Sequence, residues 1–96
     1  SEGYTGFDIS GHADAGAYGE DIICSAVSSV AYMTVNTVTE IISAPADVIE
    51  NEGHMILTLK DNIDDCQVIL NGLHLHLSEL AKSYDDNIRV CTKITK

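Results

Sequence analysis

The stretch DIICSAVSSVAYMTVNTVTEII, residues 21–42, predicts a long helix that buries one of its faces. Six residues recur at a helical spacing along one continuous face: Ile23, Val27, Val30, Thr34, Val38 and Ile41. Because valine and threonine are weak helix formers, we expect burial against the rest of the chain to keep this run helical. The chain's only proline, Pro45, follows where such a helix has ended.

Strands are predicted on both sides of this helix. In TGFDIS, residues 5–10, Phe7 and Ile9 alternate with polar residues, which is typical of a strand. Residues 11–20 are rich in glycine and alanine and predict a loop. After the helix, ADVIENEGHMILTLK, residues 46–60, predicts a hairpin, because ENEG is suited to a turn and Met, Leu and Leu then alternate with Ile and Thr.

A second helix and a last strand complete the predicted order. The helix is expected within residues 61–86, and its apolar stripe consists of Ile69, Leu70, Leu73, Leu77 and Leu80. Gly72 lies inside it and costs up to about 1 kcal/mol relative to alanine unless close packing requires it. NIRVCTKIT, residues 87–95, predicts a closing strand. We therefore expect one domain over residues 1–96, an α/β two-layer sandwich of order β-α-β-β-α-β, with the helices on one face of a small mixed sheet.

The composition limits the partners and the compartment. Fifteen acidic and five basic residues give a formal net charge of −10, which repels nucleic acids and anionic membranes. The apolar runs are too short to span a bilayer, and no secretion-signal pattern opens the chain. The three cysteines cannot all pair with one another, so we expect reduced thiols in the cytoplasm. No C-x-x-C spacing is present, and we expect no metal or other cofactor.

Cys24 and His12 form a candidate nucleophilic pair. A thiol is a poor nucleophile until it ionises, and a helix N-terminus or a nearby imidazolium favours the thiolate. If Asp21 is the N-cap, Cys24 lies in the first helical turn. Glycines 11, 16 and 19 would let the loop return His12 to that turn. The alternative is that Cys24 fills a small space in the core and that His12 lies on the surface.

The motif around these two residues resembles that of the ribosomal-processing cysteine proteases. GHA at residues 11–13, a glycine-rich loop with Tyr-Gly, and DIICSAVS carry the resemblance, which is close over residues 9–29. The remainder of the chain is similar in element order and length. Family members begin with a further strand before GFDISGHA, whereas this chain begins at SEGYTG.

The resemblance implies a function and assigns roles to particular residues. The family removes the N-terminal extension of large-subunit ribosomal protein twenty-seven, its catalytic histidine falls on His12, and its nucleophile falls on Cys24. Gly11, Asp21 and Ser28 match supporting positions. Helix capping is the favoured role of Asp21. Ser28 lies one turn after Cys24, where either substrate contact or small polar packing is expected.

The resemblance also implies a homodimer and a loop, residues 13–20, that is disordered until substrate binds. The acidic surface suits a basic ribosomal substrate. An alternative from another class is a non-catalytic, acidic, dimeric module that binds a basic ribosomal or assembly partner. The two hypotheses differ in whether Cys24 reacts as a thiolate near neutral pH.

The remaining candidates favour structural roles. His74 and His76 are two residues apart on the predicted helix and therefore point to different sides, which argues against a shared metal. His54 is expected in the hairpin turn, exposed to solvent. Acidic neighbours oppose ionisation of Cys66, and packing is expected for Cys66 and Cys91. DNIDD lacks the spacing of a calcium loop and is expected to begin the second helix.

Overall fold

The computed structural model describes residues 3–10, 20–51 and 53–84, with the side chains of residues 20–22 excepted, and contains three strands and two helices in these ranges. Their order is β1 (Gly6–Ser10), α1 (Glu20–Asn36), a π-helical turn η1 (Thr37–Ile41), β2 (Ala46–Asn51), β3 (His54–Leu59), a 3-10 turn η2 (Asp64–Cys66) and α2 (Gln67–Ser83). The predicted closing strand, residues 87–95, and residues 11–19 of the predicted loop 11–20 lie outside the described residues, whereas Glu20 belongs to α1.

The sheet has the order β1-β3-β2, and β3 is antiparallel to both neighbours. Within the described residues the sheet is thus antiparallel and not mixed as expected. Asn51 lies opposite His54, which leaves a two-residue turn between β2 and β3. Gly53 occupies this turn with φ of 77°, a left-handed conformation that glycine adopts without strain. The predicted hairpin and the predicted first strand are confirmed.

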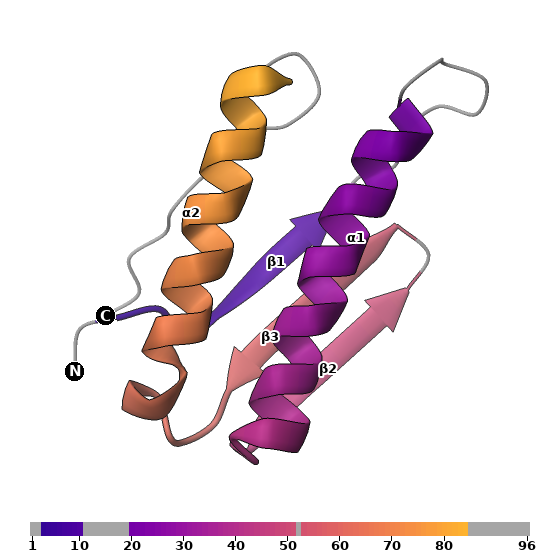
Figure 1. The fold of residues 1–96 in the computed structure, drawn as a ribbon. Coiled ribbons are helices and arrows are strands. Elements are labelled where there is room, and N and C mark those ends of the chain that lie inside the picture. Colours follow the sequence, from indigo (N-terminus) through magenta and orange to yellow (C-terminus); the bar gives the residue numbers. More distant parts are fainter. Residues whose placement is uncertain (1–2, 11–19, 52, 85–96) are drawn as a thin grey trace.

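Both helices lie on the same side of this sheet, as Figure 1 shows. The alternation predicted along β3 is confirmed, because Met55, Leu57 and Leu59 are buried while Thr58 is exposed. The buried core joins all the layers and consists of Val38, Ala44, Leu57, Leu59, Cys66 and Leu70. The chain therefore has a small α/β fold with a three-stranded antiparallel sheet and two helices in its described part.

The predicted face of the first helix is half-buried at its first three positions and fully buried at the next two. Thr34 and Val38 are fully buried, and the Thr34 hydroxyl donates to the Val30 carbonyl at 2.8 Å. Ile41, however, is 78% exposed, and Ile42 packs against the core in its place. The Ile42 N–H donates to the Thr37 carbonyl at 2.9 Å, five residues back. This wider turn changes the rotation of the side chains that follow, so a regular 3.6-residue repeat misplaced Ile41.

The chain before β1 is fixed to the start of α2 by Gln67. The Gln67 Oε1 accepts the Tyr4 N–H at 2.8 Å, and its Nε2 donates to the carbonyls of Tyr4 at 2.7 Å and Ile63 at 2.8 Å. The Tyr4 ring also stacks on His74 with centroids 5.4 Å apart. One side chain therefore pairs with both backbone groups of Tyr4 and adds a second donor to the Ile63 carbonyl, which also accepts the Cys66 N–H at 3.2 Å.

Replacement of Gln67 tests this connection. Gln67→Ala removes three hydrogen bonds and should lower the free energy of unfolding by about 1–3 kcal/mol, measured by urea denaturation. Asn71→Ala is the matched control, because the exposed Asn71 amide makes one bond, to the Gln67 carbonyl at 2.7 Å. Equal losses in both variants would contradict a special role for Gln67.

Candidate active site

Cys24 lies in the second turn of α1, later than its sequence suggests. The helix begins at Glu20, so Asp21 is its second residue and Cys24 its fifth. The prediction of Asp21 as the N-cap is therefore wrong, because glutamate is a good helix former and an acidic residue suits the first turn. The N–H groups without a helical partner belong to the turn before Cys24.

Cys24 occupies the boundary between the core and the surface. It is half-buried and unpaired. Ala31, seven residues later on the same helical face, is 2% exposed, whereas Ser28, one turn after Cys24, is exposed. α1 therefore packs along this face farther from its start and leaves Cys24 partly accessible near its N-terminal end.

Cys66 has a different environment, as the sequence predicts. It is fully buried at the end of η2 and belongs to the core. Burial raises the pKa of the Cys66 thiol, and the nearby Asp65 carboxylate raises it further. Both effects favour the neutral thiol. Of the two cysteines in the described ranges, Cys24 is the one with solvent access, and Cys91 lies outside those ranges.

The other residues of the predicted site are only partly described. Gly11 and His12 lie outside the described residues, and for Asp21 the backbone alone is described. β1 ends at Ser10, two residues before His12 in the sequence. In Figure 1, β1 is directed toward the end of the molecule at which α1 begins. The end of β1 at Ser10 and the start of α1 at Glu20 therefore lie toward the same end of the fold.

His54 is placed differently from the sequence prediction. It is the first residue of β3, and its Nε2 lies 2.6 Å from Oδ1 of Asp8 on β1. The expected position in the turn is therefore wrong, because the turn closes at Gly53 and His54 enters the sheet, but the side chain remains 40% exposed to solvent. Sequence reasoning missed this hydrogen-bonded contact, since it depends on the register that sets Ser10 opposite His54.

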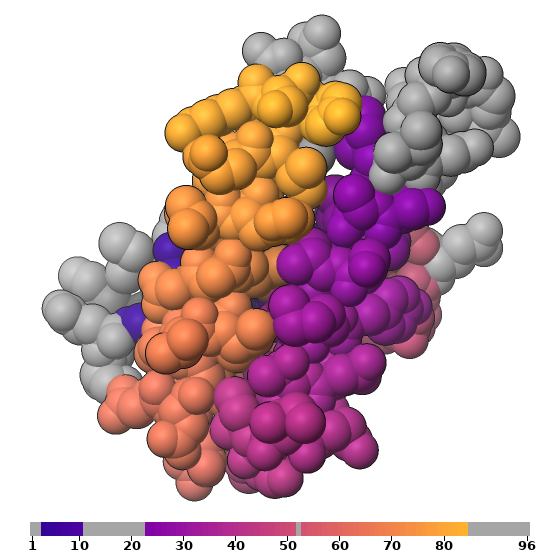
Figure 2. Space-filling view, in the orientation of Figure 1, coloured from indigo at the N-terminus to yellow at the C-terminus, as the bar shows by residue number. Residues whose placement is uncertain are grey.

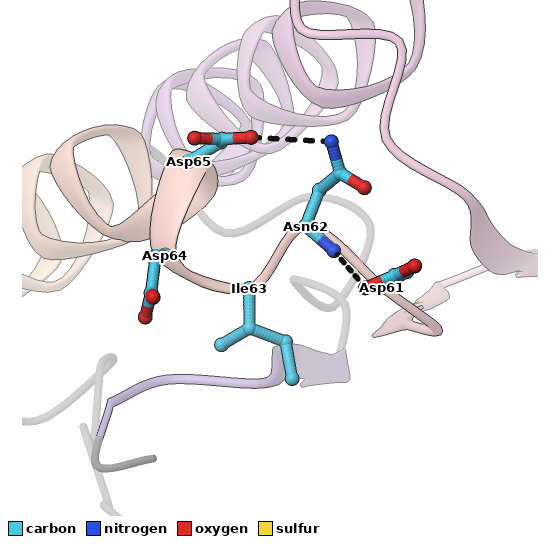
Figure 3. A pocket seen from close by; sticks show the side chains of 5 residues that line it. All are labelled: Asp61, Asn62, Ile63, Asp64 and Asp65. Carbon is cyan, nitrogen blue, oxygen red and sulfur yellow. Dashed lines mark hydrogen bonds between the residues drawn. The ribbon is translucent and has the colours of Figure 1, made fainter.

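The acidic run at residues 61–65 lines a shallow depression, but its carboxylates do not converge. Figure 3 shows the side chains of Asp64 and Asp65 pointing apart. Asp61 accepts the Asn62 N–H at 2.8 Å, and Asp65 accepts from the Asn62 amide at 3.1 Å. Over the described residues, no group of three His, Cys, Asp or Glu side chains could hold a metal ion. Neither described helix is long and apolar enough to cross a membrane.

A small α/β fold with an accessible cysteine near the start of a helix is compatible with thiol chemistry, and comparison with known proteins identifies the class. Residues 1–89 match the family described as cysteine protease Prp. The chain therefore belongs to the Prp family, and it is a cysteine protease.

Curated relatives and solved structures agree with this family. The ribosomal processing cysteine protease Prp of Staphylococcus aureus strain Mu50 is 35% identical over 85 residues, which cover 85% of this chain and 80% of the relative. The Bacillus subtilis strain 168 protein of the same name is 27% identical over 100 residues, with 97% and 89% covered. A crystal structure of S. aureus Prp with a covalently linked product peptide superposes with a TM-score of 0.81 at 34% identity, covering 93% of this chain and 87% of that one.

The buried Cys66 thiol predicts a dependence of stability on alkaline pH. Its pKa in the folded chain is raised above the ordinary value of 9.0, so the unfolded chain releases this proton first. The neutral thiol's contribution to the free energy of unfolding is fully present below the pKa of Cys66 in the unfolded chain. It is lost as the pH rises through the pKa of Cys66 in the folded chain. Urea unfolding of the wild type should therefore show a steeper loss of stability above about pH 9 than Cys66→Ala shows. Parallel pH profiles would contradict this environment for Cys66.

Proposed function

We propose that this chain is an endopeptidase that removes the N-terminal extension of large-subunit ribosomal protein twenty-seven, with Cys24 as nucleophile and His12 as general base. The observation that carries the proposal is the half-buried Cys24 near the start of α1, compared with the fully enclosed Cys66. The sequence motif assigns the same two positions. The name of the S. aureus relative and the product peptide linked covalently to its structure support peptide hydrolysis in ribosome processing.

The reaction follows from the chemistry of a thiol and an imidazole. His12 accepts the proton of the Cys24 thiol, and the thiolate attacks the carbonyl carbon of the scissile peptide bond. The carbon–nitrogen bond then breaks as the His12 imidazolium gives its proton to the leaving amine. Water hydrolyses the resulting thioester, releasing the carboxylate product and restoring the Cys24 thiol.

The position of Cys24 in the second turn determines what stabilises the two negative charges of this reaction. The N–H groups without helical partners lie at the start of α1, and we assign the oxyanion to the backbone of residues 20–22. The influence of the helix dipole falls off within the first turn, so the His12 imidazolium is the main stabiliser of the Cys24 thiolate. Gly11 and Asp21 support this arrangement, and the exposed Ser28 contacts the substrate.

The proposed setting is the cytoplasm. The net charge of −10 on this chain favours binding of a basic ribosomal protein. We further propose that two copies of the chain pair with each other. Residues 87–95 would add the closing strand to the sheet and complete the β-α-β-β-α-β order. The alternating sequence NIRVCTKIT supports this last assignment.

Substitution of the two proposed catalytic residues should reduce cleavage without loss of the fold. Cys24→Ala removes the nucleophile and should abolish cleavage of the ribosomal extension, measured by mass spectrometry of the products. His12→Ala should lower the rate by about 10²–10⁴-fold, the typical contribution of positioned proton transfer. Substrate affinity should change far less, because the imidazole adds little binding surface.

Matched variants separate these effects from general damage. Cys66→Ala removes the enclosed thiol and His54→Ala removes the histidine paired with Asp8, and both should retain cleavage. Turnover by Cys24→Ala would refute the nucleophile. Loss of turnover in a folded Cys66→Ala, with Cys24 intact, would assign the nucleophile elsewhere.

A further inference from the structure

β2 is an outer strand of the sheet, and its free edge has no partner strand among the described residues. The order β1-β3-β2 of the described strands leaves one side of β2 unpaired. The Lys60 N–H donates to the Pro45 carbonyl at 2.8 Å, so the odd-numbered residues of β2 are the ones that bond to β3. The N–H and C=O groups of Ala46, Val48 and Glu50 therefore point away from β3, along the free edge.

The sequence of β2 does not block this edge. Edge strands are usually protected by a lysine, a proline, a bulge or a very short length. β2 has six residues, ADVIEN, with neither lysine nor proline, and its register against β3 contains no bulge. Val48 is 40% exposed on the helix side of the sheet, and Ile49 is 52% exposed on the opposite side. Figure 1 shows β2 at the margin of the sheet, and in Figure 2 pink atoms of the β2–β3 hairpin project past α1.

The other outer strand, β1, is less open to an added strand. The Leu59 N–H bonds to the Thr5 carbonyl, so the backbone groups of Tyr4 face away from β3, and the Gln67 side chain bonds both of them. β1 itself exposes no large apolar side chain. The edge of β2 is therefore the better candidate for strand addition.

Carboxylates flank the exposed apolar residues of β2. Asp47 and Glu50 enclose Val48 and Ile49 in the sequence, and all four residues are exposed. The Asp47 carboxylate lies 3.3 Å from the Lys60 ammonium, whereas Glu50 has no ion-pair partner in the described ranges. A strand paired with β2 therefore meets a carboxylate, two aliphatic side chains and a second carboxylate in succession.

We infer that the free edge of β2 binds an extended basic segment of the protein substrate, outside the peptide bond that is cut. The segment adds a strand to the sheet through backbone hydrogen bonds to Ala46, Val48 and Glu50. Its side chains follow the order basic, apolar, apolar, basic, so that the two bases meet Asp47 and Glu50 across the strand pair. This inference rests on the proposed function and adds to it a second binding surface, separate from Cys24.

β2 leads toward the end of the fold at which α1 begins. β1 and β2 are both antiparallel to β3, so they run in the same direction. Asn51 at the end of β2 lies opposite His54, which lies opposite Ser10 at the end of β1. A strand along the six residues of β2 spans about 20 Å. One extended substrate chain can therefore occupy this edge and continue toward the end of the fold at which α1 begins.

Charge favours a basic segment over a second copy of this chain at the edge. Two β2 strands paired antiparallel about their centre place the Asp47 carboxylate of one copy opposite the Glu50 carboxylate of the other. Like charges directly opposite each other destabilise a strand pair, and both copies carry a net charge of −10. A segment with two bases at these positions forms pairs of opposite charge instead.

Amide hydrogen exchange, followed by NMR on the full chain with Cys24→Ala to prevent cleavage, tests this surface. The probe is a short peptide with lysine-valine-isoleucine-lysine at its centre, and the control peptide has glutamate in place of both lysines. The N–H groups of Val48 and Glu50 should exchange rapidly in the free chain and at least about tenfold more slowly with the saturating lysine peptide. The Ile49 N–H faces β3, should keep its rate and is an internal control.

Kinetics with the ribosomal substrate protein connect the edge to cleavage. Glu50→Lys replaces attraction by repulsion, and Val48→Pro removes an outward N–H while leaving the bonds to β3 in place. Each should raise KM for the substrate protein about three- to tenfold with kcat unchanged. Neither should affect a short peptide that covers only the scissile bond. Asp64→Lys, at an exposed position outside β2 and with the same change of charge, is the matched control and should leave KM unchanged.

The outcomes separate this edge from its alternatives. Slow exchange of the Val48 and Glu50 N–H groups in the free chain would show that the chain itself covers the edge, and would overturn the inference. Equal protection by the glutamate peptide, or equal effects of Glu50→Lys and Asp64→Lys, would also overturn it. A sedimenting mass that falls with Val48→Pro would assign the edge to a second copy.

The proposed function fails in a different way. If the wild-type chain does not cleave the substrate protein, the proposed function is wrong, and the substrate is no longer the source of the basic segment. If the chain cleaves the substrate protein and the edge variants leave KM unchanged, the edge alone is refuted.

Discussion

The alternation of side chains along β3 is the constraint on which the described structure depends. β3 is hydrogen-bonded on both sides, so its backbone groups are satisfied by β1 and β2. Its side chains at Met55, Leu57 and Leu59 all enter the core. A shift of one residue in the register would turn these three side chains away from the core. The placement of both helices and of β1 therefore follows from this strand.

The position of Cys24 is a consequence of how α1 packs over this core. Val38 in the π turn contributes to the core that contains Leu57, and Ala31 and Thr34 are buried on the same helix. A helix rich in valine and threonine depends on this burial, because its intrinsic preference for helix is weak. Cys24 lies toward the other end of α1, and its side chain is only half-buried there.

Local patterns in the sequence predict the elements, whereas the contacts between distant residues require the structure. The period-2 pattern of residues 54–59 and the turn at Gly53 identify the hairpin, because both signals lie within one short segment. The Gln67 hydrogen bonds to Tyr4 join residues 63 positions apart and have no periodic signature. The contact of Asp8 with His54 also depends on strand register.

The same division applies to the candidate site. The motif predicts Cys24 and His12 as the catalytic pair, and the acidic residues next to Cys66 in the sequence argue against ionisation of its thiol. The start of α1 at Glu20 was not predicted, because Glu20 and Asp21 are both suited to a helix N-terminus and only the backbone decides between them. This small shift moves Cys24 out of the first turn, and the proposed mechanism therefore assigns stabilisation of the thiolate mainly to the His12 imidazolium.

The pH dependence of Cys24 alkylation by iodoacetamide, followed by peptide mass mapping, tests this account most directly. Wild type and His12→Ala should be compared on native chain at equal concentration. Cys24 of the wild type should react at lower pH than Cys24 of His12→Ala, because the imidazolium stabilises the thiolate. Superimposable curves would show that His12 does not act on this thiol, and a wild-type Cys24 that remains unreactive near neutral pH would favour a non-catalytic binding module.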